Sequence, residues 1–344
     1  KQWRGLAART DKLAIAYQAA LHLAGILIWT RRQPRRQNLD RLSATQYTQR
    51  RLTREVHDHL CEPFFSGGIV LGDPDKITAA DMLFYGVKLL SPQFNSPKGL
   101  GVLTESLADH LPVTLGVSVT AVHTTERGAV VCWSQDGTPQ PDMHAHAVVV
   151  ALPAPRVPRI LPQLSKEDAD YLRSIPYSRT LATSFGLSNR PRETSPFVFM
   201  PRRDHPEIAS MALHHNKIPG RVDNGQGLIT VYPRKHFTDQ WWDRDDESIA
   251  ARVLAATAAV LPEIQGTVPT THVSRHDAAL VVRPPGDYAA LRAFNSRRRA
   301  ADPRIQLAGD YLGPSSTYGA LRSGEQAAAR LLEHLRHHPP TSLA

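Results

Sequence analysis

The sequence contains few cysteines, and they are not spaced for a metal site or a redox motif. Cys61 and Cys132 are the only two among 344 residues. A disulfide framework and a Cys-x-x-Cys site are therefore excluded, and a reducing, cytoplasmic compartment is the expected location. Histidines such as His144 and His146 lack closely spaced cysteine or carboxylate neighbours. We therefore expect no metal site.

Signature motifs of several enzyme classes are also absent. The sequence has no Gly-x-Ser-x-Gly elbow and no P-loop, which excludes the commonest hydrolase and kinase patterns. It also has no Gly-x-Gly-x-x-Gly between a strand and a helix. Gly67-Gly68 and Gly99-Leu-Gly101 lack both that spacing and a preceding apolar strand. No segment is therefore predicted to bind a dinucleotide pyrophosphate in the usual way.

No apolar run is long enough to predict a membrane-spanning helix. The most apolar stretch, residues 13–29, is shorter than the about 20 residues that a span needs, and it contains Gln18, His22 and Gly25. It predicts a buried helix, with peripheral membrane contact as the alternative. The sequence shows no secretory signal. Because it begins at Lys1 rather than at a methionine, we expect a longer protein.

The charge is strongly positive, with a net charge of +9 and a pI of about 9.8. Arginines form short clusters at 31–32, 35–36, 50–51 and 297–299. Such a balance is found in proteins that bind nucleic acid or anionic lipid, but here acidic residues interrupt the clusters. We therefore predict a basic surface without a nucleic-acid partner.

The apolar content of 41% is sufficient for a large core, and the pattern predicts a mixed α/β chain. Near the N-terminus, Ser43 is expected to cap a helix that runs to about Cys61 and ends at Pro63. Gly67-Gly68 is expected to form a turn, and Thr78 to cap the next helix. Residues 1–97 are thus predicted to be a helical layer.

Strands dominate the middle of the chain. A helix at 102–111 is followed by a hairpin, with strands around 117–122 and 129–133, and by an apolar strand at 146–152. Prolines then mark a crossing between domains. The pattern predicts further strands and one helix, and Trp241 and Trp242 are expected to be core or pocket wall. The strands are at 180–187, 196–200, 208–213 and 227–232, and the helix is at 245–260.

The C-terminal stretch reads as a strand at 305–308, a turn at Gly309-Asp310 and a helix from Gly319. Ser315, Ser316 and Thr317 can cap this helix, while Gly319 and Ala320 keep its first turn free of bulk. Free N–H groups there would accept an anion or an electron-rich ring edge. The Asp310 carboxylate suits a ligand with hydroxyl groups rather than a bare phosphate. The alternative is a packing corner in which Gly324 makes the close contact.

This segment resembles the C-terminal flavin motif of the flavin-dependent amine oxidase superfamily, which includes protoporphyrinogen oxidases and phytoene-desaturase-type enzymes. The matching residues are Gly309, Asp310, Gly319, Ala320, Ser323, Gly324, Glu325, Ala327 and Ala328. The resemblance implies an FAD-dependent oxidoreductase that transfers a hydride from a C–N or C–C unit of a small or lipophilic substrate to the flavin. It implies FAD-binding roles for Val119, Gly309, Asp310, Tyr318, Gly319 and Ala320.

The resemblance also implies a two-domain FAD/NAD(P)-binding fold, here incomplete because its first Gly-x-Gly-x-x-Gly unit is missing. Four segments are expected: a helical part of the substrate domain (1–97), two flavin-domain segments (98–155 and 300–338), and a substrate-domain sheet with a helix (156–299). His276 stands where the family frequently has a tryptophan, and no catalytic residue can be named. The alternatives are a desaturase or isomerase acting on an isoprenoid, and a non-catalytic basic binding module.

Overall fold

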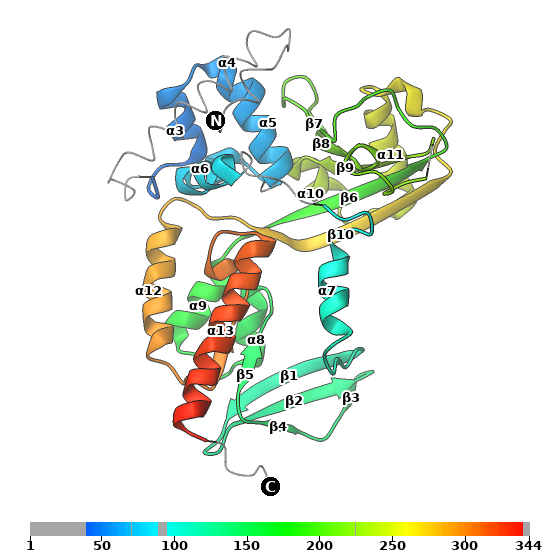
Figure 1. The fold of residues 1–344 in the computed structure, drawn as a ribbon. Coiled ribbons are helices and arrows are strands. Elements are labelled where there is room, and N and C mark those ends of the chain that lie inside the picture. The colour runs from blue at the N-terminus through cyan, green and yellow to red at the C-terminus, as the bar shows by residue number, and fades with distance from the viewer. Residues whose placement is uncertain (1–38, 70, 89–94, 224, 340–344) are drawn as a thin grey trace. The chain divides into compact units, whose positions relative to one another are not determined.

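The computed structural model describes residues 39–69, 71–88, 95–223 and 225–339. The chain is a mixed α/β protein, as predicted, and it divides into two compact units that each combine distant segments (Figure 1). Unit 1 comprises Lys1–Leu107 and Ser178–Leu280, and unit 2 comprises Ala108–Tyr177 and Val281–Ala344. The helix predicted at 13–29 lies outside the described residues.

The units differ from the expected segments at three places: 98–107, 156–177 and 281–299. Residues 156–177 and 281–299, expected in the substrate domain, belong to unit 2. The physical reason is a shared core, in which Leu172 and Phe294 from these segments are fully buried together with Val122 and Ile305. The expected flavin-domain segments 98–155 and 300–338 fall in unit 2 from residue 108 onward.

The first described part of unit 1 is helical. Ser43 caps the first helix with a capping box, in which its hydroxyl accepts from the Gln46 N–H, as predicted. Thr78 accepts from the Ala80 N–H at the start of α6. The helical segments are α3 (Ala44–Arg51), α4 (Arg54–Val56), a π-helix (His57–Cys61), α5 (Glu62–Phe64), a second π-helix (Phe65–Ile69), a 3-10 turn (Pro74–Lys76) and α6 (Ala79–Lys88).

Two of the expected breaks in this region are wrong. Pro63 does not end the helix: the helical run continues through it, from the π-helix His57–Cys61 into α5 and the second π-helix. Gly67 and Gly68 do not form a turn but lie in the second π-helix. A Cβ on Gly67 would lie 2.7 Å from the Ala209 carbonyl oxygen, and one on Gly68 would lie 2.6 Å from Cε1 of Phe199. The two glycines therefore allow the helix to approach the sheet closely.

Unit 1 contains a five-stranded sheet in the order β10-β6-β9-β8-β7. The helix α11 packs on β8 and β9, and its cap is Asp245. Trp241 and Trp242 pack against the core that α11 forms with the sheet, as expected. The bounds are β6 Tyr177–Leu187, β7 Phe197–Phe199, β8 Ile208–Leu213, β9 Gly227–Pro233, β10 Thr270–Val281, α10 Lys235–Trp241 and α11 Asp246–Ala258.

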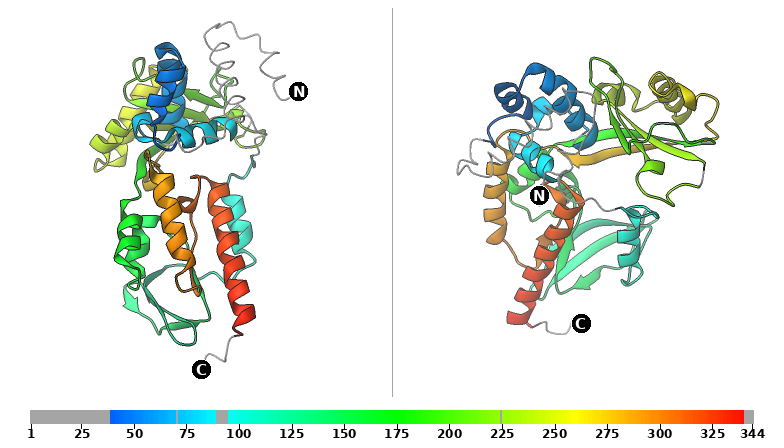
Figure 2. Two further views of the ribbon diagram at one scale, coloured as in Figure 1. Left: turned by 90° about the vertical axis from the view of Figure 1, so that its left-hand side faces the viewer. Right: turned by 45° about the horizontal axis from the view of Figure 1, so that its top comes forward.

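Unit 2 contains the predicted hairpin and a short parallel pair of strands, β5 and β11. The C-terminal helix α13 packs beside this pair (Figure 2). Sequence reasoning did not predict α9 or α12. The bounds are β1 Val117–Thr124, β2 Ala129–Gln135, β3 Thr138–Pro139, β4 Met143–Ala145, β5 Val148–Val150, α8 Val157–Ile160, α9 Lys166–Ser174, α12 Asp287–Arg299, β11 Ile305–Leu307 and α13 Thr317–His337; α7 (Gly101–Ala108) spans the boundary between the units.

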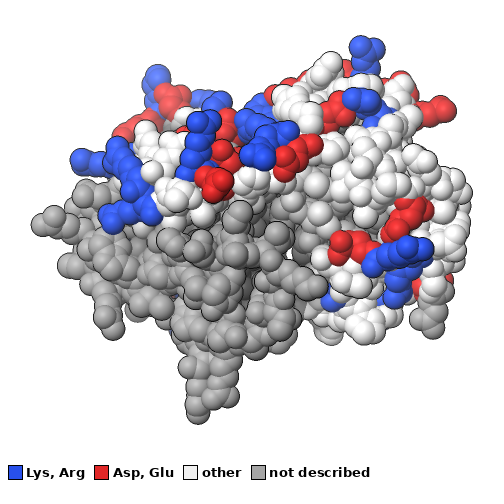
Figure 3. All heavy atoms as spheres, turned by 90° about the horizontal axis from the view of Figure 1, so that it is seen from above, with Lys and Arg blue, Asp and Glu red and all other residues white. Residues whose placement is uncertain are grey.

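On the face seen in Figure 3, acidic side chains stand among the lysines and arginines. None of the helices within the described ranges combines the length and the apolar character needed to cross a membrane.

A buried arginine joins the helical layer of unit 1 to its sheet. The Arg234 side chain is 3% exposed, and its Nη1 lies 2.9 Å from Oε1 of Glu62. The same guanidinium donates to the Ser66 hydroxyl and to the carbonyl oxygens of Met200 and His205. Burial lowers the pKa of Arg234, while Glu62 opposes that shift. Glu62 therefore supplies the counter-charge that makes the burial of Arg234 tolerable.

We expect Glu62→Ala to destabilise the protein by about 3–5 kcal/mol, because it leaves a buried guanidinium without its carboxylate. The matched control is Asp58→Ala, which removes a carboxylate from the same helical segment whose partner, Arg54, is 91% exposed. That surface pair should contribute less than about 1 kcal/mol. Chemical denaturation of both variants measures the difference, and equal losses would contradict the account.

Candidate active site

The C-terminal segment forms the predicted strand, turn and helix. Strand β11 pairs in parallel with β5, Ile305 opposite Val148, and the chain then turns through Gly309 and a 3-10 turn at Asp310–Leu312. Helix α13 begins at Thr317, capped by Ser316. The position of this turn at the carboxyl end of a parallel strand is where α/β sheets usually bind ligands.

Hydrogen bonds hold the Asp310 carboxylate in place. The Ser315 hydroxyl donates to Oδ2 of Asp310 at 2.6 Å and accepts the Val281 N–H at 3.2 Å. The Gly309 N–H donates to the Ser323 hydroxyl at 2.8 Å, which ties the turn to α13. Asp310 is half-buried, and no described residue donates to its Oδ1. This oxygen can accept a hydroxyl of a ligand.

Arg283 fixes the backbone of the same turn, a role that sequence reasoning missed. Its side chain is 0% exposed and forms an ion pair with Asp287. Its Nε donates to the Gly313 carbonyl at 3.1 Å, and its Nη2 donates to the Tyr311 carbonyl at 2.5 Å. The available signal was a charged residue between Val281-Val282 and Pro284 in an otherwise apolar stretch.

Tyr311 packs under the turn. Its ring is fully buried. A Cβ added to Gly309 would lie 2.3 Å from Cε1 of Tyr311, so only glycine fits at position 309. Burial raises the pKa of Tyr311, and no described residue bonds to its hydroxyl. Burial also raises the pKa of Tyr177 to about 12, and its hydroxyl accepts the Ala154 N–H. Both phenols therefore remain protonated at neutral pH.

The remaining predicted FAD-binding residues occupy different environments. Tyr318 is 60% exposed, Ala320 is exposed, and Gly319 is buried. Val119, 40% exposed, lies beside a β-bulge in β1 and is not part of the hydrogen-bonded group around Asp310, although both belong to unit 2.

The expectation of free N–H groups at Gly319 and Ala320 is wrong. The Gly319 N–H donates to the Ser316 hydroxyl at 3.0 Å, and the Ala320 N–H donates to the Ser316 carbonyl at 2.9 Å. The serine cap therefore satisfies these donors. The positive end of the α13 dipole still lies at this turn.

The packing-corner alternative is correct for Gly319 but not for Gly324. A Cβ on Gly319 would lie 2.2 Å from the Pro314 carbonyl oxygen, whereas one on Gly324 would meet nothing within 4 Å. Gly319 is thus required by packing, which does not depend on any cofactor.

The second face of the unit 1 sheet is polar, in contrast to the apolar face that packs on α11. The Ser184 and Thr230 hydroxyls lie 2.8 Å apart, and Nε2 of His214 lies 2.9 Å from the Thr230 hydroxyl. Burial, reinforced by Lys217, lowers the pKa of His214 to about 4, so its imidazole is neutral at pH 7. Phe197 and Phe199 stack at the edge of this face, with ring centroids 6.1 Å apart.

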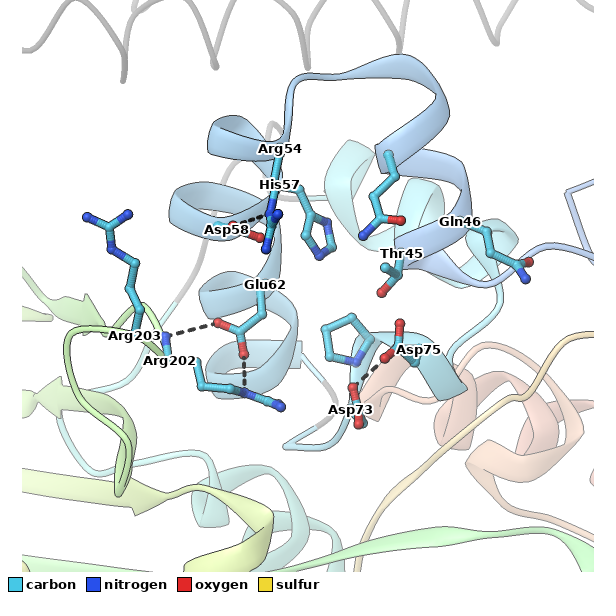
Figure 4. Close-up of a pocket in the computed structure, with 12 residues that line it drawn as sticks. Thr45, Gln46, Arg54, His57, Asp58, Glu62, Asp73, Asp75, Arg202 and Arg203 are labelled. Atoms are coloured by element: carbon cyan, nitrogen blue, oxygen red, sulfur yellow. Dashed lines mark hydrogen bonds and ion pairs between the residues drawn. The ribbon is translucent and has the colours of Figure 1, made fainter.

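A wide polar pocket also opens on unit 1, with a volume of about 880 Å³. Figure 4 shows Glu62 between the arginines that line it, and Arg54 beside Asp58. Arg54 pairs with Asp58 and Arg202 with Glu62, and Asp73 and Asp75 add two more carboxylates. The lining includes His57 but no Phe, Tyr or Trp side chain. Its composition does not suit an apolar amine or a flavin ring.

We expect Gly319→Val to destabilise the protein by about 1–3 kcal/mol, because the new side chain overlaps the Pro314 carbonyl oxygen. The matched change, Gly324→Ala in the open part of the same helix, should stabilise by roughly 0.5–1 kcal/mol. Thermal unfolding without added cofactor measures both. A Gly319→Val protein as stable as the parent would show that the turn differs from the one described.

A family model, "Flavin containing amine oxidoreductase", matches residues 1–332. Solved structures with similar folds include putrescine oxidase bound to putrescine, with 16% identity, TM-score 0.73, and coverage of 94% of this chain and 78% of that chain. Cyclohexylamine oxidase from Brevibacterium oxydans IH-35A is 14% identical with TM-score 0.71, covering 95% and 77%. A protoporphyrinogen oxidase candidate from Exiguobacterium sp. 255-15 is 18% identical with TM-score 0.63, covering 85% and 67%.

These likenesses extend the resemblance of the C-terminal segment to nearly the whole chain. The structural neighbours show the fold, and the family match shows the class of enzyme and the cofactor. The chain belongs to the flavin-containing amine oxidoreductase family and is an FAD-dependent oxidoreductase.

Proposed function

We propose that the protein oxidises a C–N bond of a small or lipophilic amine, with FAD held at the Gly309–Ser316 turn. The observation that carries the proposal is the Asp310 carboxylate, fixed by Ser315 on one oxygen and open on the other. A carboxylate in this state suits the hydroxyl groups of a ribityl or ribose chain. The open oxygen of the Asp310 carboxylate therefore fits a hydroxyl group of FAD.

FAD, when bound, supplies the hydride acceptor of the reaction. The chain's own residues hold the turn that would position FAD, and they stabilise the charge that develops near it. Arg283 fixes the turn carbonyls, and Ser323 fixes the Gly309 N–H. The α13 dipole stabilises negative charge near its N-terminus. The exposed Tyr318 and Ala320 are the surface of the helix start that a ligand can reach.

The substrate side of the proposal rests on the polar face of the unit 1 sheet. The neutral His214 with Thr230 and Ser184 offers donors and acceptors without a fixed charge, and Phe197 offers an apolar wall. Because these three groups carry no negative charge, they favour the free-base form of an amine, from which a hydride leaves more readily than from an ammonium. Putrescine oxidase and cyclohexylamine oxidase, which share the fold, carry amines in their names.

The proposal includes no nucleic-acid partner, because acidic and basic side chains mix on the face in Figure 3. Peripheral membrane contact through basic residues remains part of the proposal for lipophilic substrates. Co-sedimentation with anionic vesicles at low and high salt tests that part separately.

The direct test of the reaction is anaerobic mixing of the FAD-loaded protein with a panel of primary amines. We expect an amine of the right class to bleach the flavin absorbance stoichiometrically. Bleaching by an isoprenoid alkene, with none by any amine, would favour the desaturase alternative. Failure to hold flavin at all would favour a binding module.

We expect Asp310→Ala to weaken FAD binding roughly ten- to a hundredfold, because a charge-assisted hydrogen bond contributes about 1.5–3 kcal/mol. The control is Glu333→Ala, an exposed carboxylate on α13 far along the helix from the turn. Fluorescence titration with FAD measures both dissociation constants. Unchanged affinity in Asp310→Ala would remove Asp310 from the cofactor site.

A further inference from the structure

The loop after β8 gathers basic groups at the end of the polar sheet face. It is held rigidly at its start: the Asn216 side chain donates to the Glu193 carbonyl at 2.7 Å, and Nδ1 of His215 accepts the Leu228 N–H at 3.1 Å. These contacts use His215 and Asn216 for anchoring. The side chains of their neighbours His214 and Lys217 do not take part in this anchoring.

Lys217 is a half-buried cation without a carboxylate partner. Its Nζ lies 4.1 Å from the centroid of the Phe197 ring, and no acidic side chain within the described ranges forms an ion pair with it. Arg221 is also half-buried and has no carboxylate partner within the described ranges. Its guanidinium donates to the Ser96 carbonyl at 2.8 Å and to the Pro97 carbonyl at 3.4 Å, neither of which carries a charge.

His214 completes the group. Its Nδ1 is buried and has no partner among the described residues. The Lys217 N–H donates to the His214 carbonyl at 3.1 Å, which holds both residues in one turn, and Arg221 follows four residues later on the same loop. This nearness places them in one cluster rather than along an extended surface.

The cluster lacks negative charge. Half-buried cations are normally paired, because removing them from water costs free energy that a counter-ion offsets. The nearest acids by sequence do not serve: Asp223 is exposed, and the Glu193 carboxylate accepts the Ser195 N–H at 2.6 Å. Elsewhere in the chain the buried Arg234 and Arg283 each have a carboxylate, Glu62 and Asp287. Lys217 and Arg221 therefore differ from these two buried arginines.

We propose that Lys217 and Arg221 bind a carboxylate of the substrate, so that the substrate is an amine that also carries an acid group. The Phe197 ring beneath the ammonium, stacked on Phe199, provides an apolar contact for the rest of the molecule. The inference rests on the proposed function, because it takes the polar sheet face as the substrate site. It narrows the substrate from amines in general to amino acid-like amines with an apolar or aromatic body.

The test uses benzoate as the probe, because it offers one carboxylate and one aromatic ring and needs no turnover. Calorimetric titration of the protein with benzoate should give saturable binding, and the uncharged benzamide should bind at least about tenfold more weakly. Lys217→Met keeps the length of the apolar stem but removes the charge, and it should lose the preference for benzoate. Lys166→Met, an exposed lysine whose side chain is 91% accessible, is the matched control.

The pH dependence provides a second readout. Burial, assisted by Arg221, lowers the pKa of Lys217 to about 8. Benzoate affinity should therefore be full at pH 7 and fall as pH rises through about 8, while Lys217→Met shows no such fall. His214, which neighbours Lys217 and has a pKa of about 4, is already neutral over this pH range and does not produce the change.

Stability separates recognition from a structural role. A lysine whose pKa is lowered in the folded state destabilises that state below its folded pKa, so Lys217→Met should unfold at the same or a higher temperature at pH 7. Equal binding of benzoate and benzamide, or full benzoate binding by Lys217→Met, would overturn the proposal. Because no step involves flavin, this failure is distinct from a failure of amine oxidation, which anaerobic bleaching reports.

Discussion

The buried Arg283 guanidinium is the interaction on which the candidate cofactor site depends. It donates hydrogen bonds to the carbonyl oxygens of Tyr311 and Gly313 and forms an ion pair with Asp287, and all of these residues belong to unit 2. These contacts determine the path of the turn between β11 and α13. The hydrogen bond from Ser315 to Oδ2 of Asp310 forms within this path and leaves Oδ1 of Asp310 open.

In unit 1 a buried arginine is likewise paired with a carboxylate, whereas Lys217 is not. Arg234 connects the π-helical segment to the sheet because Glu62 accompanies it into the interior. Lys217 is half-buried, and its ammonium contacts the Phe197 ring instead of a carboxylate. A protein that neutralises its buried arginines but leaves this lysine and Arg221 without acids has a place for an anion brought from outside. The charge pattern thus connects the architecture to substrate choice.

Local sequence signals predicted the elements well where local forces decide them. The caps at Ser43, Thr78 and Ser316, the hairpin, and the strand-turn-helix at 305–320 follow from side chains that bond to their own backbone. Tertiary packing decided what was missed. Gly67-Gly68 looked like a turn because the sheet that it contacts, at Ala209 and Phe199, is distant in the sequence.

The same limit applies to the site. The sequence indicated Asp310, but not that Ser316 would satisfy the Gly319 N–H or that Arg283, 27 positions before Asp310, would hold the turn carbonyls, because both depend on the three-dimensional path of the chain. The cluster of Lys217, Arg221 and His214 was likewise invisible as a site. Its defining property is a missing counter-charge, which only the burial and contacts of the folded chain reveal.

The most direct measurement of the central claim is hydrogen–deuterium exchange with and without FAD. The account predicts slower exchange on FAD addition in peptides that cover the Gly309–Ala320 turn, with no change in the β2–β4 hairpin edge of the same unit. FAD binding that leaves exchange at 309–320 unchanged would contradict the assignment of the cofactor to this turn.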